Sequence, residues 1–236
     1  MTSSQTNPAA SAHNAHATTR GFFLSSAAWM AVGTLAGLIG ALELVAPDLL
    51  ANLELIVFGR IRAVHTNAVM FGFVGSALIG AAFYFVPVLV RTPLFSEAVG
   101  RIALWLWNIS LAAGCGALML GHTQSREYAE LIWPVDIAIL VAFALIFANL
   151  LQTVKRREEH ILYVSIWYVF AALVFSFFNY LLGNAVWNPE TGSLTGMPDA
   201  ILAWFYGHNI IGFFFTILAV ALAYYIIPIV SRAPLY

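Results

Sequence analysis

The chain has 236 residues, of which 61% are hydrophobic and only 9% are charged, and its mean hydropathy is +0.87. A soluble domain keeps about a quarter of its residues charged so that its surface stays hydrated, so this composition predicts a membrane protein. Ten Lys and Arg balance eleven Asp and Glu, which excludes a nucleic-acid partner because no basic surface is left for phosphates. The single cysteine excludes a disulfide framework, a cysteine-rich metal cluster and covalently attached c-type haem.

The first 20 residues are polar and show no apolar period, which predicts a disordered cytoplasmic tail (1–20) before one membrane domain (21–236). The run from Phe22 to Ala46 is long enough to cross a bilayer and lacks a small-residue cleavage site, so it is a membrane helix rather than a signal peptide. From Pro47 to Ile61, apolar residues recur at helical spacing, which predicts an amphipathic helix lying in the membrane interface.

Five further apolar runs follow the first, and each must be helical because unpaired backbone groups are too costly in lipid. The sequence therefore predicts an all-α membrane protein with six transmembrane helices. If the amino terminus is cytoplasmic, seven basic residues lie inside and three outside, which satisfies the positive-inside rule. The five runs are Ala63–Val90, Ala98–Gly121, Leu131–Leu151, Ile161–Leu182 and Asp199–Val230; the inside residues are Arg20, Arg91, Arg101, Lys155, Arg156, Arg157 and Arg232, and the outside ones are Arg60, Arg62 and Arg126.

Two histidines lie inside predicted spans, where an ionisable group suggests a function. His65 begins the second span, and His208 lies nine residues beyond Asp199 on the sixth, about 13 Å along the helix, so both belong to the outer half of the membrane. Neutral imidazole is a common ligand of iron and copper and the usual axial ligand of haem. The spacing alone leaves open the alternative that both are buried histidines bonded to backbone or hydroxyl groups. Aromatic residues that fit a porphyrin pocket surround them: Phe71, Phe73, Trp105, Trp107, Trp204, Phe205 and Phe213 to Phe215.

Charged residues near the outer surface accompany the histidines. Arg60 and Arg62 precede His65 by five and three residues, so they could hold a carboxylate or phosphate of a cofactor, or else reach toward lipid headgroups. An acidic cluster of Glu127, Glu130 and Asp136 lies at the outer ends of the third and fourth spans. Such oxygens suit a hard cation such as calcium, although an acidic outer loop can also exist without a ligand.

Three segments in order resemble one family: His65 to Phe73, Ser125-Arg126-Glu127-Tyr128-Ala129-Glu130-Leu131-Ile132-Trp133-Pro134, and Trp204-Phe205-Tyr206-Gly207-His208-Asn209 with Gly212-Phe213-Phe214. Together they resemble the catalytic subunit I of cbb-type cytochrome c oxidases, the C family of haem-copper oxidases. The sixth-span segment differs from the related nitric oxide reductases, which typically carry a glutamate near the metal-ligating histidine. A nitric oxide reductase relative is therefore the less favoured alternative.

The resemblance implies roles for individual residues. It makes His65 an axial ligand of the low-spin haem b, and it makes His208 one of three histidines that hold the catalytic copper. Arg62 and Trp204 match positions that contact haem propionates, with Arg60 nearby, and Glu127 matches a carboxylate that helps to bind calcium. Further along the sixth span, Thr216, Tyr224 and Tyr225 could line a proton route, or they could simply bond within the helix or at the interface.

Subunit I of this family has about twelve spans, and its later helices supply the second haem b ligand, the high-spin haem b ligand, two copper histidines and a cross-linked tyrosine. The six spans here correspond to the amino-terminal half, either as a fragment or as one polypeptide of a split subunit. The expected partners are the carboxy-terminal half, the c-type cytochrome subunits, cytochrome c, dioxygen and the lipid bilayer of a bacterial inner membrane.

The assembled enzyme would pass electrons from cytochrome c through haem b to a haem-copper centre and reduce dioxygen to water, coupled to proton translocation. Two other functions stay open on the sequence. One is a non-catalytic haem-binding membrane subunit for assembly or sensing. The other is a transporter or channel, which is disfavoured because no span combines a broken helix with a charged midplane site.

Overall fold

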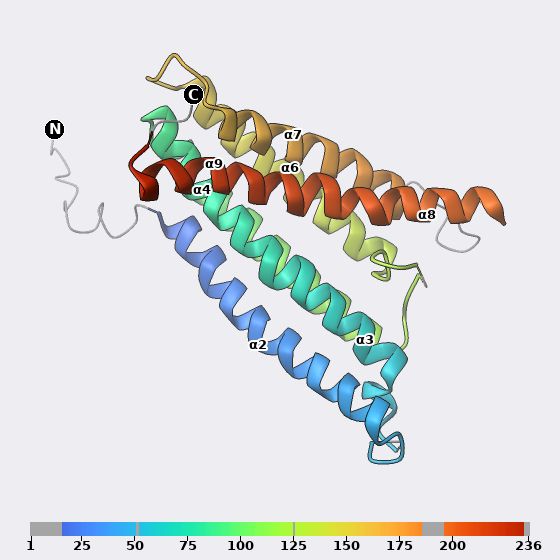
Figure 1. The fold of residues 1–236 in the computed structure, drawn as a ribbon. Coiled ribbons are helices and arrows are strands. Elements are labelled where there is room, and N and C mark those ends of the chain that lie inside the picture. Colours follow the sequence, from blue (N-terminus) through green and yellow to red (C-terminus); the bar gives the residue numbers. More distant parts are fainter. Residues whose placement is uncertain (1–15, 51, 125, 186–195, 234–236) are drawn as a thin grey trace, which may run out of the picture.

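A computed structural model of the chain describes residues 16–50, 52–124, 126–185 and 196–233. Within these ranges every regular element is helical, and the helices pack as one bundle (Figure 1). The α-helices are α2 (Ala17–Val45), α3 (Phe58–Asn67), α4 (Ser76–Val90), α5 (Glu97–Met119), α6 (Trp133–Lys155), α7 (Val164–Tyr180), α8 (Met197–Asn209) and α9 (Ile217–Ser231). A short 3-10 helix, η1 (Glu54–Ile56), and three π-helical segments, η2 (Ala68–Gly75), η3 (Leu181–Ala185) and η4 (Ile210–Thr216), complete them.

The π-helical segments join α-helices into continuous rods. α3, η2 and α4 form one helix from Phe58 to Val90, and α8, η4 and α9 form another from Met197 to Ser231. With α2, α5, α6 and the α7–η3 helix, the described residues contain six helices long and apolar enough to cross a membrane. The all-α fold with six predicted spans is confirmed.

The helices alternate in direction, so the bundle has two ends. We call the end where α2 begins and α9 ends the near end, and the end where α3 and α8 begin the far end (Figure 1). The predicted division of basic residues follows these ends, because the seven residues assigned inside belong to helix ends or loops of the near end. Arg60, Arg62 and Arg126 belong to the far end.

Two predicted segments differ from the structure. α2 begins at Ala17, so the last residues of the predicted tail are helical, and residues 1–15 lie outside the described ranges. The early start has a physical reason, because the Glu97 carboxylate accepts hydrogen bonds from the Thr18 N–H (2.9 Å) and hydroxyl (2.6 Å) and so satisfies a free donor of the first turn.

The predicted amphipathic helix from Pro47 to Ile61 is wrong for the described residues of that segment. Turns lead from α2 to the short helix η1, and α3 has already begun at Phe58. The chain reverses direction between Val45 and Phe58. The turns that reverse it occupy most of this connection, which leaves no room for a long helix in the interface. Its leucines at 49 and 53 are exposed, so the apolar spacing reflects residues at a membrane boundary rather than a packed helix face.

Glycines bring α2 against the α3–η2 helix. A Cβ on Gly33 would lie 2.7 Å from Val69 Cγ2, and one on Gly72 would lie 2.6 Å from the Trp29 ring. Because real Cβ atoms do not approach so closely, these positions have no room for a larger residue. These glycines thus mark a close helix contact, and this contact holds His65.

A cluster of buried aromatic rings fills the middle of the bundle. Trp107 contacts Phe71, Phe143 and Phe214, with ring centroids 5.3 to 6.4 Å apart in tilted or edge-on arrangements. Only part of the predicted aromatic surround belongs to it, because Trp105, Trp204 and Phe205 are 64%, 60% and 49% exposed. The predicted set therefore divides into a packed core and an outward-facing group.

Candidate functional site

His65 belongs to α3 and is partly buried against α2, with its ring held by a backbone carbonyl of α2. Nδ1 lies 2.8 Å from the carbonyl oxygen of Gly33, a contact in which only the nitrogen can donate. The proton is thereby placed on Nδ1, so Nε2 carries the lone pair. Among the described residues Nε2 has no hydrogen-bond partner. A ring fixed in this way through one nitrogen is the usual preparation of a histidine for metal ligation through the other.

The cradle of His65 depends on a second glycine. A Cβ on Gly37 would lie 2.7 Å from Nδ1 and 2.8 Å from Cε1 of His65. The glycines at 33 and 37 therefore supply a hydrogen-bond acceptor and a space for the imidazole, one helical turn apart. These observations fit a haem ligand whose orientation α2 fixes.

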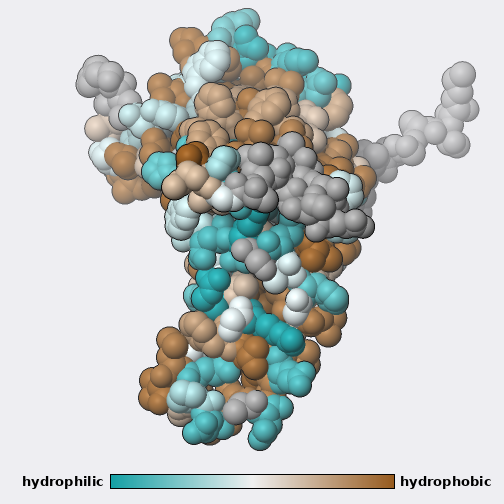
Figure 2. All heavy atoms as spheres, turned by 90° about the vertical axis from the view of Figure 1, so that its right-hand side faces the viewer, coloured by the Kyte–Doolittle hydropathy of each residue, from teal (hydrophilic) through white to brown (hydrophobic). Residues whose placement is uncertain are grey.

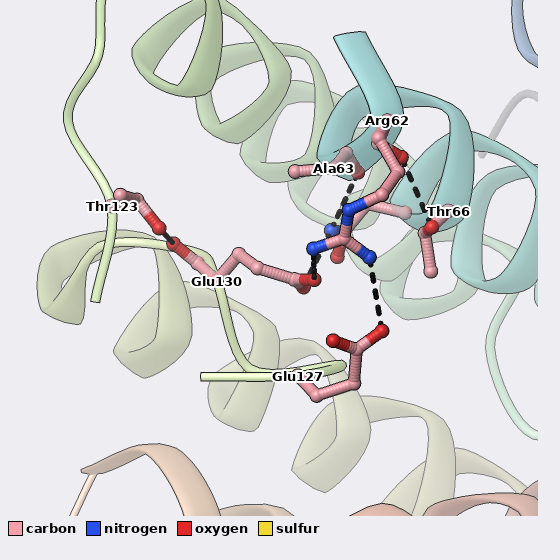
Figure 3. A network of polar contacts seen from close by, with 7 residues as sticks. Arg62, Ala63, Thr66, Thr123, Glu127 and Glu130 are labelled. Carbon is pink, nitrogen blue, oxygen red and sulfur yellow. Dashed lines mark hydrogen bonds and ion pairs between the residues drawn. The ribbon is translucent and has the colours of Figure 1, made fainter. Parts of the chain in front are cut away.

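Arg62 faces a loop from residues 122 to 132 that connects α5 to α6, which we call the far-end loop (Figure 3). Its guanidinium lies 3.0 Å from a Glu127 oxygen and 3.9 Å from a Glu130 oxygen. The Glu127 pair is exposed, whereas Glu130 is only 3% exposed and accepts a hydrogen bond of 3.1 Å from the Asn67 amide. Burial raises the pKa of Glu130, an effect that the Asn67 hydrogen bond and the charge of Arg62 oppose.

A cavity of about 440 Å³ opens beside these residues. Three arginines and two glutamates contribute to its walls, and one buried oxygen of Glu130 has no hydrogen bond. Figure 2 looks onto the far end of the bundle and shows hydrophilic surface gathered across its middle, with apolar surface on either side. The cavity can hold a group that carries its own charges, such as carboxylates or a cation. Its lining includes Arg60, Arg62, Arg126, Glu127 and Glu130.

Arg60 points away from Arg62 toward α5. Its guanidinium donates to the Met119 carbonyl oxygen (3.0 Å) and lies beside Gly121, whose φ is +88°. A Cβ on Gly121 would lie 3.0 Å from that guanidinium. Gly121 thus permits both the left-handed turn at the end of α5 and the approach of Arg60.

Asp136 does not join the acidic cluster predicted from the sequence. Its carboxylate is fully buried in the first turn of α6, where it accepts hydrogen bonds from the Tyr180 hydroxyl (2.7 Å) and the Gln124 amide (2.5 Å). Gln124 belongs to the far-end loop, and its amide also donates to the Leu131 carbonyl oxygen. Asp136 therefore fixes the loop that presents Glu127 and Glu130, rather than facing the cavity itself.

The far-end loop is fixed to α8 as well. The Tyr206 hydroxyl donates to the carbonyl oxygen of Tyr128 (2.8 Å), and Arg126 pairs with Asp199. Tyr128 has a positive φ of 62°, and its ring packs edge-on against Trp204 with centroids 6.5 Å apart. One loop thus connects the Arg62 site with the helix that carries His208.

His208 lies on the exposed side of α8. Its side chain is exposed, while its neighbours Tyr206 and Gly207 are buried against the bundle. Trp204, one turn earlier, is 60% exposed. Within the described residues no three His, Cys, Asp or Glu side chains come together as a metal site. His208 can therefore supply one ligand to a centre formed with groups from outside these residues.

Both histidines directly precede a π-helical segment. His65 is followed by η2 from Ala68, and His208 by η4 from Ile210. The two segments meet in the bundle, where the rings of Phe71 and Phe215 lie 5.9 Å apart. π-helical turns are rare in proteins, but a large share of them lie at functional sites. Their position beside both histidines therefore supports a functional role, and the sequence alone did not reveal it.

The residues suggested for a proton route lie on different sides of α9. Tyr225 stacks on Phe85 of α4 with centroids 5.3 Å apart, whereas Tyr224 stacks on Tyr168 of α7 at 5.7 Å. Thr216, at the end of η4, is exposed. The described residues do not bring the three together.

Sequence reasoning missed the residues that fix the far-end loop. Gln124, Tyr180 and Tyr206 acquire their roles only when that loop folds over α6, α7 and α8. Asn67 also escaped notice, although it lies two residues beyond His65 in the same motif. Its polar side chain in an apolar span was the available signal.

Comparison with known proteins matches residues 17–236 to the family model of cytochrome c and quinol oxidase polypeptide I. The cbb3-type cytochrome c oxidase subunit CcoN1 of Stutzerimonas stutzeri is 35% identical over 98% of this chain and 49% of its own length. Cytochrome c oxidase subunit 1 of Rhodobacter capsulatus is 34% identical over 88% of this chain and 41% of its own. The chain spans about half the length of such relatives or somewhat less. This multi-pass membrane protein therefore belongs to the cytochrome c and quinol oxidase polypeptide I family, whose members are haem-copper oxidase subunits.

Proposed function

We propose that this chain is the haem b-binding part of a terminal respiratory oxidase of the cbb type. In this proposal His65 is an axial ligand of low-spin haem b, and His208 is one ligand of the catalytic copper. The enzyme takes electrons from cytochrome c, reduces dioxygen to water and translocates protons across a bacterial inner membrane. The near end of the bundle is cytoplasmic, in agreement with its excess of Lys and Arg.

The observation that carries the proposal is the environment of His65. Its Nδ1 is bonded to the Gly33 carbonyl oxygen, Gly37 leaves space for the ring, and Nε2 is left available for a metal. A buried histidine that served only packing would be expected to bond through both nitrogens or to lie against apolar atoms. This one is fixed through a single nitrogen.

The charges one turn away fit the periphery of a haem. Arg62 and the cavity beside it suit propionate carboxylates through charge-assisted hydrogen bonds, with Trp204 and Arg60 at the same end. The Glu127 carboxylate, 43% exposed in its pair with Arg62, suits a calcium ion shared with those propionates. Arg62 then serves two anions, the bound carboxylates and Glu127, and balances their charge.

The exposed face of α8 is the place where the other half of the catalytic centre would lie. The partners in this proposal are the carboxy-terminal half of subunit I, which supplies the remaining ligands of the copper and of both haems b, and the c-type cytochrome subunits. When bound, the haems and copper supply the electron transfer and oxygen chemistry. The chain orients His65, holds the propionate end with Arg62 and presents His208. Thr216, Tyr224 and Tyr225 remain candidates for proton transfer toward the near end.

The test uses the assembled oxidase isolated from its native membrane. His65→Ala should abolish the low-spin b band in reduced-minus-oxidised spectra, whereas His208→Ala should keep that band but lose copper and oxygen uptake. His160→Ala is the matched control, because His160 is exposed at the near end and should change neither reading. A full low-spin band in the His65 variant would refute the haem assignment. Normal copper content with normal turnover in the His208 variant would refute the copper assignment.

A further inference from the structure

A second surface of the molecule, on a helix that carries neither histidine, combines a cation unpaired within the described residues with a shallow, open apolar hollow. The outward face of α5 at the near end forms a hollow of about 490 Å³. Ile102, Trp105 and Ile109 line it and are 58%, 64% and 60% exposed, and Arg101 stands at its near-end side. The lining is therefore apolar apart from one cation.

The charge of Arg101 is not used within the described part of the chain. Its natural helical partner would be Glu97, four residues earlier, but the Glu97 carboxylate turns to the first turn of α2 and accepts two hydrogen bonds from Thr18. No ion pair or hydrogen bond joins Arg101 to any residue in the described ranges. A guanidinium at a membrane boundary that lacks an internal partner is available to an external anion.

The length of the hollow distinguishes between possible occupants. From Ala98 to Ile109 the helix rises by roughly 16 Å, at about 1.5 Å per residue, which is about half of a hydrocarbon core some 30 Å thick. A transmembrane helix of another subunit would itself span the whole core, about twice the length of this hollow. The apolar part of the hollow is as long as one leaflet is deep, and its cation lies at the level of the headgroups. These two features match the acyl chain and the phosphate of a single phospholipid.

We propose that this hollow, which we call the α5 groove, binds an anionic phospholipid. The phosphate accepts hydrogen bonds from the Arg101 guanidinium, and an acyl chain lies along Ile102, Trp105 and Ile109. The flat Trp105 ring forms the wall of the groove one turn below the headgroup, a level at which tryptophan is favoured in membrane proteins. The site depends neither on haem nor on copper, so it can be tested separately from the proposed oxidase activity.

The experiment measures lipid binding by the intact assembly after detergent exchange. Native mass spectrometry would count bound phosphatidylglycerol against phosphatidylcholine of the same acyl chains. We expect the wild type to retain phosphatidylglycerol preferentially, and Arg101→Gln to weaken it about tenfold, as expected for the loss of a charge-assisted hydrogen bond. Trp105→Ala should weaken both lipids, because it removes apolar wall rather than charge.

Arg232→Gln is the matched control, since Arg232 is also exposed at the near end but lies outside the groove. It should retain phosphatidylglycerol as the wild type does. A photo-crosslinking amino acid at position 105 gives an independent reading, and its expected product is a lipid adduct. Equal lipid binding by the Arg101 and Arg232 variants, or a crosslink from position 105 to a polypeptide, would overturn the proposal.

Discussion

The two candidate metal ligands occupy opposite environments. His65, on α3, is partly buried against α2 and fixed by a hydrogen bond to Gly33, whereas His208 stands on the exposed side of α8 without a described partner. The chain thus builds the support of one ligand entirely from its own helices and leaves the other to be supported from outside. The difference teaches that the proposed haem ligand is preorganised by packing within this chain, while the proposed copper ligand would depend on assembly.

The largest expected effect on stability lies at Asp136, which fixes the far-end loop. Asp136→Leu removes the acceptor of a buried donor on Tyr180 and a partly buried donor on Gln124, and should lower the free energy of unfolding by roughly 2 to 4 kcal/mol. Asp136→Asn keeps one acceptor oxygen and should lose less. Thermal unfolding of the purified assembly measures both. If the leucine variant were as stable as the wild type, the far-end loop would not depend on this carboxylate.

Two glycine substitutions, one near each histidine, should change the free energy of unfolding differently: the first should lower it, and the second should leave it unchanged or raise it. Gly37→Ala places a methyl group 2.7 Å from His65 Nδ1, so it should cost about 1 to 3 kcal/mol and weaken the low-spin haem band. Gly212→Ala, four residues beyond His208, meets no atom within 4 Å. It should be neutral or stabilising by up to about 1 kcal/mol, because alanine is the better helix former. Equal effects at the two positions would erase the contrast between them.

The histidines themselves should differ in structural importance. His65→Ala loses the hydrogen bond to Gly33 and should destabilise the haem-free protein by about 1 kcal/mol. His208→Ala alters an exposed side chain and should stay within about 0.5 kcal/mol of the wild type. Chemical denaturation of protein prepared without haem makes the comparison. A larger loss of stability in the His208 variant than in the His65 variant would contradict the exposed, unsupported position assigned to His208 on α8.

A small effect is also expected at the ion pair that borders the cavity. Glu127→Gln breaks an exposed pair with Arg62 and should cost at most about 1 kcal/mol, because such pairs are solvated and contribute little. If calcium binds here, the same variant should lose bound calcium while keeping its fold. Elemental analysis beside thermal unfolding separates the two readings, and unchanged calcium content would remove Glu127 from the proposed site.

The sequence predicted the bundle well, because apolar run length and backbone hydrogen bonding in lipid leave few alternatives. It also singled out His65, Arg62 and Glu127, which the fold brings to the same end of the bundle as expected from their positions. It failed from Pro47 to Ile61, where apolar spacing at a membrane boundary imitates an amphipathic helix.

The contacts made by side chains of the far-end loop could not be predicted. Asp136 was grouped with Glu127 and Glu130 because the three are close in the chain. Its actual partners, Tyr180 and Gln124, depend on how the loop folds over two helices, and no local pattern encodes that path. The same holds for Tyr206, whose hydroxyl reaches a loop carbonyl 78 positions earlier in the chain.

The π-helical segments after the two histidines have a consequence for comparing this chain with other sequences. A π-helical turn contains one residue more than an α-helical turn, so each segment acts like a one-residue insertion inside a continuous helix. Deleting a single residue from η4 would let the helix return to α geometry with its near-end faces unchanged. A return to α geometry with every residue kept would instead rotate the near-end half by about 100° relative to His208. Tyr224 and Tyr225 would then exchange neighbours with other faces of α9. An alignment that omits the one-residue gap would assign the wrong residues to every face beyond it.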